Sequence, residues 1–95
     1  MPEMRFQIRW PDGAEEVCYS PSLVIKDHLA VGTSYSVADF LERSRTALTI
    51  ASDRVQAKYG MPCSRALRQL ALIENRASRF TPAAAGQVTV LTFEE

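Results

Sequence analysis

The first residues of the chain alternate apolar and polar side chains, from Met4 to Trp10. A period of two predicts a β-strand with one buried face, because successive side chains on a strand point to opposite faces. The sequence Pro11–Gly13 supplies a turn, and residues 15–19 are then expected to form the returning strand of a hairpin. A run rich in β-branched residues from Val88 to Phe93 predicts a last strand, which pairs most simply beside the first.

Between these strands the spacing of apolar residues becomes helical. A continuous stripe predicts one long helix over residues 37–59, with Ser36 as its N-cap and Gly60 at its C-terminal end. Ser64 is expected to cap a second helix over residues 65–79, and a loop is expected over residues 81–86.

A short helix is expected from Leu23 to Ala30, although its Leu-Val-Ile start would also suit a strand. The order strand, strand, short helix, long helix, helix, strand predicts an α+β fold. We expect a small antiparallel sheet, made of the N-terminal hairpin and the C-terminal strand, with one long and one shorter helix packed on one face. The other face carries Arg5, Gln7 and Arg9 and is expected to meet solvent or a partner.

Length and charge narrow the classes of function. A chain of 95 residues predicts one domain with one core, and 11 basic and 11 acidic residues cancel. Composition therefore gives no reason to expect a nucleic-acid or membrane partner. No apolar run approaches the length of a membrane span, and Met1–Arg5 lacks the apolar segment of a signal peptide. A reducing cytoplasm with free thiols is therefore expected.

The sequence predicts neither a cofactor nor a metal site. It contains no glycine-rich nucleotide-binding motif and no cluster of cysteines. One histidine and two distant cysteines supply too few ligands for a closed zinc site.

The segment between Cys18 and His28 concentrates reactive side chains. Cys18 or Ser22 as nucleophile, with His28 as base, would form a small active site if the fold brings them within hydrogen-bond reach. The alternative is a packed thiol and a partly exposed histidine. Ser20, Ser22, Lys26 and His28 would instead bind an anion if the amides at the start of the short helix are exposed. The alternative there is that Ser22 only caps the helix.

Two apolar residues fall outside the buried stripes of their helices, and arginines flank both. Ile50 is near Arg54, and Leu72 lies between Arg68 and Arg76 on the second helix. Single exposed apolar residues are ordinary, but an apolar residue bordered by arginine also describes a protein interface. A small sheet leaves edge strands exposed as well, so we expect a homo-oligomer or a contact with another protein.

The second helix also carries arginines along one side, at positions 65, 68, 76 and 79. A nucleic-acid site would combine such a basic face with aromatic side chains, which this helix lacks. A solvated face is therefore favoured, and nucleic-acid binding is not expected.

Several local strings resemble one known family. They are Met4–Phe6 with Arg9–Gly13, Cys18–Ser22, Phe40–Leu41 with Ser44–Ser52, and Lys58–Gly60. Together they resemble a family of small bacterial nitrogen-starvation-response proteins. Its members are encoded in clusters with a nitrilase, a radical SAM protein, an N-acetyltransferase and a flavoprotein, and such clusters are linked to nitrile or cyanide nitrogen assimilation. The resemblance implies a pathway and a compartment but no catalytic residues, because the family has no assigned activity.

Three functions follow, in order of preference. The first is a non-catalytic accessory protein that binds a cluster-encoded enzyme or a small nitrogenous metabolite. The second is a small enzyme that acts on a nitrile-derived or amide compound, using Cys18 or Ser22 with His28. The third is an anion-responsive regulator that uses the arginines of the second helix.

Overall fold

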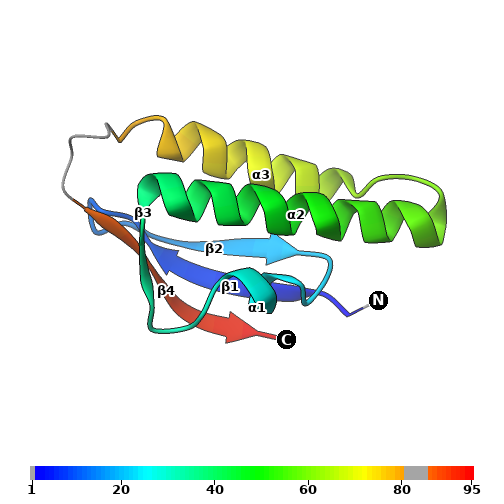
Figure 1. The fold of residues 1–95 in the computed structure, drawn as a ribbon, viewed down its shortest axis with the longest axis horizontal. Helices are drawn as coiled ribbons and strands as arrows, with labels where there is room; N and C mark the ends of the chain where they lie inside the picture. Colours follow the sequence, from blue (N-terminus) through cyan, green and yellow to red (C-terminus); the bar gives the residue numbers. More distant parts are fainter. Residues whose placement is uncertain (1, 81–85) are drawn as a thin grey trace.

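A computed structural model describes residues 2–80 and 86–95 of the protein. In this part of the chain, four strands form one antiparallel sheet in the order β2-β1-β4-β3 (Figure 1). The strands are β1 (Met4–Arg9), β2 (Glu15–Ser20), β3 (Ser34–Ser36) and β4 (Gln87–Glu94). The hairpin and the C-terminal strand beside β1 confirm the sequence prediction. The short strand β3, which pairs with β4 at the far edge, was not predicted.

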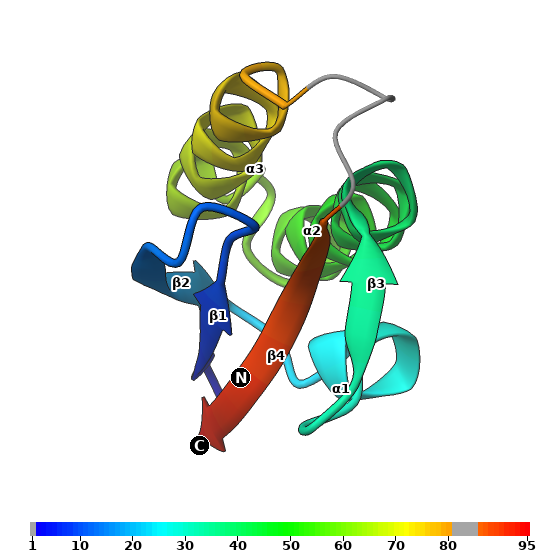
Figure 2. The same ribbon diagram turned by 90° about the vertical axis from the view of Figure 1, so that its left-hand side faces the viewer.

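The helices pack on one face of this sheet, as predicted (Figure 2). They are α1 (Ile25–His28), α2 (Val37–Tyr59) and α3 (Ser64–Ala77). The two long helices lie side by side, with α3 toward β2 and α2 toward β3 and α1. The fold is therefore α+β. Most of the loop expected over residues 81–86 lies outside the described residues.

The predicted ends of α2 are confirmed. The hydroxyl of Ser36 accepts a hydrogen bond from the Asp39 amide at 3.1 Å, which satisfies one of the free amides of the first turn. Gly60 ends the helix with a φ of 82°, a left-handed conformation that glycine adopts without steric cost.

The predicted caps of the two shorter helices are wrong. Ser64 lies inside α3, whose N-cap is Cys63 and has no capping side-chain bond. In α1 the N-cap is Val24 rather than Ser22, and the helix covers only Ile25–His28 instead of residues 23–30. The reason is local. The Ser22 hydroxyl accepts a hydrogen bond from the Val24 amide at 3.3 Å, and this contact folds the chain into a turn before the helix begins.

The core between sheet and helices is centred on Trp10. This ring is buried, stacks on Phe80 with centroids 5.8 Å apart, and meets the edge of Phe40 at 5.7 Å. Phe40 comes from α2 and Phe80 follows α3, so one aromatic ring ties both helices to the hairpin. Aromatic pairs of this geometry add stability beyond their buried area.

We predict that Phe40→Ala lowers the free energy of unfolding by about 3–5 kcal/mol, because it opens a cavity beside Trp10. Urea denaturation measures this loss. Val31→Ala is the control, since Val31 is 51% exposed, and should change stability by less than about 0.5 kcal/mol. A loss at Phe40 no larger than that of the control would contradict the central place of the aromatic cluster.

Candidate functional site

The structure does not bring the proposed nucleophile and base together. Cys18 lies on β2, where it pairs with Phe6 of β1. His28 ends α1, which lies beside β3, at the opposite edge of the sheet from β2 (Figure 2). The carbonyl of His28 accepts a hydrogen bond from Arg43 of α2 at 3.0 Å, and no hydrogen bond joins His28 to Cys18. Closeness in the sequence is lost because α1 turns away beneath α2.

The thiol of Cys18 is also in a poor environment for a nucleophile. Its side chain is buried, and its polar neighbour is the Glu16 carboxylate, with the sulfur and Oε2 3.9 Å apart. Burial, and then the negative charge of Glu16, raise the pKa of Cys18 far above its ordinary value. The thiol is therefore protonated at neutral pH, and only the thiolate is a strong nucleophile.

The candidate anion-binding residues are likewise separated or already bonded. The Ser20 hydroxyl is buried and donates to the Ser22 carbonyl at 2.7 Å. The Ser22 hydroxyl, also buried, accepts a hydrogen bond from Arg54 of α2 at 3.0 Å. Lys26 pairs with Glu95 at 3.0 Å on the surface. These contacts fix the connection between β2 and α1.

The residues predicted to form one interface lie on two different sides of the helix layer. Ile50 is half-buried and packs against the core, and Arg54 on the same helix bonds to Ser22 near α1. Leu72 is 49% exposed and lies on α3 with Arg68 and Arg76, toward β2. Only the α3 group therefore forms an open surface.

Helix α3 is held along the outer edge of β2 by polar contacts. Near its start, the Arg65 guanidinium lies over the Tyr19 ring, 3.9 Å from the ring centroid. One turn later Gln69, which is only 9% exposed, accepts a hydrogen bond from the Tyr19 amide at 3.0 Å. Near its end Arg76 pairs with Asp12 of the hairpin turn at 3.2 Å. The helix therefore runs antiparallel to β2.

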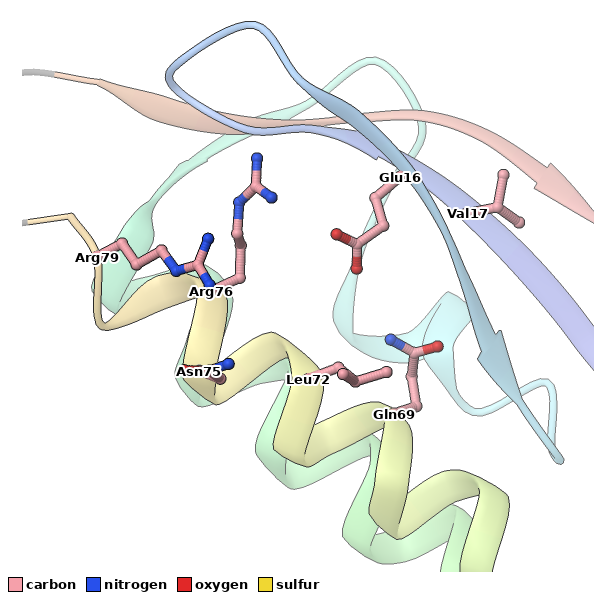
Figure 3. Close-up of a pocket in the computed structure, with 7 residues that line it drawn as sticks. All are labelled: Glu16, Val17, Gln69, Leu72, Asn75, Arg76 and Arg79. Carbon is pink, nitrogen blue, oxygen red and sulfur yellow. The ribbon is translucent and has the colours of Figure 1, made fainter.

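Between these contacts the helix and the strand leave open space. One hollow of about 370 Å³ lies between the middle of β2 and the second half of α3 (Figure 3). Its lining, which we call the β2–α3 groove, is Glu16, Val17, Gln69, Leu72, Asn75, Arg76 and Arg79. A neighbouring hollow of about 280 Å³ shares Gln69 and Leu72 and extends toward Tyr19, Arg65 and Arg68.

The backbone of β2 is unpaired along this groove. The backbone amide of Trp10 donates a hydrogen bond to the Ala14 carbonyl at 2.8 Å. In an antiparallel pair, every second residue bonds to the neighbouring strand, so the backbone groups of residues 16, 18 and 20 point toward β1. The backbone groups of Glu15, Val17 and Tyr19 point outward. The Tyr19 amide donates its hydrogen bond to the side chain of Gln69. Among the described residues, the Glu15 and Val17 backbones have no hydrogen-bond partner beyond this edge.

Sequence reasoning missed four residues of this groove, which are Glu16, Val17, Gln69 and Asn75. Gln69 is spaced with Ala66 and Ile73 on the buried stripe of α3, so a polar residue at an inward position was the available signal. Val17 lies in the predicted returning strand, and the structure leaves it 58% exposed beside the groove.

Other classes of site find no support in the described part of the chain. Within residues 2–80 and 86–95, no group of three histidine, cysteine or acidic side chains is placed to hold a metal ion. None of the helices there is both long and apolar enough to cross a membrane.

An α+β fold with an open strand edge beside an arginine-bearing helix defines a class of small domain but not an activity. Residues 5–93 match the family described as nitrogen starvation-induced protein NitG, so the chain belongs to this family. The resemblance seen in the sequence is thereby confirmed. No curated protein and no solved structure matches the chain.

We predict that Cys18 is inert toward Ellman's reagent in the folded protein, because its thiol is buried and protonated. The Cys63→Ala variant isolates this thiol, and the Cys18→Ala variant leaves the partly exposed Cys63 as the control. Cys63 should react at neutral pH, whereas Cys18 should react only after urea is added. Rapid reaction of Cys18 in the native protein would restore the thiol as a candidate nucleophile.

Proposed function

We propose that the protein is a non-catalytic accessory protein of the nitrogen-starvation response, and that it binds a partner protein through the β2–α3 groove. The observation that carries the proposal is an unpaired strand edge beside an exposed leucine and several arginines. Interface centres are apolar and their rims polar, with arginine enriched among the residues that dominate binding. Leu72 supplies the apolar centre here, and Arg68, Arg76 and Arg79 supply the rim.

The contacts around the other candidate residues favour this proposal over an enzyme. A nucleophile needs its base within hydrogen-bond reach, and the Cys18 thiol has Glu16 beside it instead of His28. The Ser22 hydroxyl already accepts hydrogen bonds from Arg54 and the Val24 amide. These contacts give Cys18 and Ser22 a structural role, which supports an accessory protein over a reaction on a nitrile-derived or amide compound.

The arginines of α3 also suit a protein partner better than a small anion. Arg65 and Arg76, the two nearest the ends of β2, are engaged with Glu3 at 3.9 Å and Asp12 at 3.2 Å. They position the helix, and the remaining arginines are spread along the groove rather than gathered at one point. Within the nitrogen-starvation response that the family name indicates, a cluster-encoded enzyme in the cytoplasm is the partner we propose.

We predict that Leu72→Asp lowers the amount of captured partner by about tenfold or more, because it places a charge at the apolar centre of the surface. The tagged protein is used to capture partners from nitrogen-starved cells, and mass spectrometry quantifies the cluster-encoded enzymes. Leu67→Asp is the matched control, since Leu67 lies on the same helix at 45% exposure but outside the groove. Equal capture by both variants, each with an unchanged circular dichroism spectrum, would refute the proposed surface.

A further inference from the structure

We infer that the occupant of the β2–α3 groove is an extended, acidic segment of the partner protein, added to the sheet as a further strand beside β2. This inference rests on the proposed function and specifies how the partner is recognised. Addition of a strand to an exposed sheet edge draws affinity from main-chain hydrogen bonds and specificity from alternate side chains.

The backbone requirement is met by the middle of β2. The amides and carbonyls of Glu15 and Val17 point away from β1, and no described residue bonds to them. Next to them, Gln69 makes with Tyr19 the kind of contact that an added strand would make, with its oxygen 3.0 Å from the amide nitrogen. Gln69 therefore blocks the edge at Tyr19, and the added strand is confined to the part of the edge beside Glu15 and Val17.

The side chains of such a strand would face two different surfaces. Residues opposite Val17 would point to the open face of the sheet, and those between them would point toward α3. Toward α3 they would meet Leu72 in the middle of the groove and the arginines beyond it (Figure 3). An apolar residue flanked at alternate positions by acidic ones is the pattern that fits this surface.

The charge of the groove selects an acidic occupant. Among the described residues no ion pair joins Arg68 or Arg79 to an acid, and Glu16 is the acidic side chain that lines the hollow. A second copy of the chain fits less well, because pairing two β2 edges would bring their α3 helices, each with the same arginines, face to face. Like charges placed opposite one another oppose association.

The test uses a synthetic heptapeptide, acetylated and amidated, with the sequence threonine-glutamate-valine-leucine-valine-glutamate-threonine. As an added strand, its leucine and glutamates face α3 and its valines bond to β2. We expect it to shift the NMR signals of β2 and α3 at millimolar concentration. N-methylation of both valines should weaken binding about tenfold or more, since it removes main-chain bonds to β2.

The controls separate strand addition from attraction by charge alone. N-methylation of both glutamates blocks amides that point away from β2 and should leave affinity within about threefold. Exchange of both glutamates for lysine, or the Arg79→Glu substitution in the protein, should weaken binding about threefold or more. Three results would each overturn the inference. They are the absence of any NMR shift with the peptide, an equal loss of affinity for the two methylated peptides, and a dimer of the protein in sedimentation. If the peptide does not bind while capture of the partner still depends on Leu72, only strand addition is refuted. If capture does not depend on Leu72 either, the proposed function is refuted as well.

Discussion

The hydrogen bond from the Tyr19 amide to the side chain of Gln69 fixes where α3 lies, and the open surface depends on that position. Gln69 occupies the inward stripe of the helix and reaches the outer edge of β2 at 3.0 Å. Loss of such a partner leaves a polar group unpaired and costs about 1–3 kcal/mol. The contacts of Arg65 with Tyr19 and of Arg76 with Asp12 hold the helix on either side of this bond. Together they hold α3 beside the strand but do not cover the strand itself.

An open edge strand is normally a hazard, because it offers unpaired backbone groups to any other strand. The two edges of this sheet limit that hazard differently. Strand β3 is only three residues long, and its end is followed directly by α2. Strand β2 is longer, but Gln69 occupies its outer edge at Tyr19. Arginines of α3 lie near the rest of that edge. Under the proposed function, positive charge there would repel a copy of the same edge and admit an acidic segment, so protection from self-association and selection of a partner would have one cause.

The sequence predicted what depends on local periodicity and missed what depends on distant contacts. Alternation from Met4 to Trp10 and the signals at Ser36 and Gly60 identified the hairpin and the long helix, because neighbours along the chain determine both. Strand β3 has three residues and no periodicity to detect. Cys18 and His28 suggested a pair because they are close in sequence, yet burial of one and the turn into α1 separate them. Leu72 was identified as exposed, but the role of Gln69 required knowing that α3 overlies the edge of β2.

Amide hydrogen exchange along β2, measured by NMR in the free protein and with the captured partner, tests the account most directly. We expect the Cys18 and Tyr19 amides to be protected in the free protein, because the first donates its hydrogen bond to β1 and the second donates to Gln69. The Val17 amide between them should exchange rapidly until the partner binds and should then become protected. A Val17 amide already protected in the free protein would mean that the edge is covered. A Val17 amide that stays rapid in the complex would mean that the partner binds elsewhere.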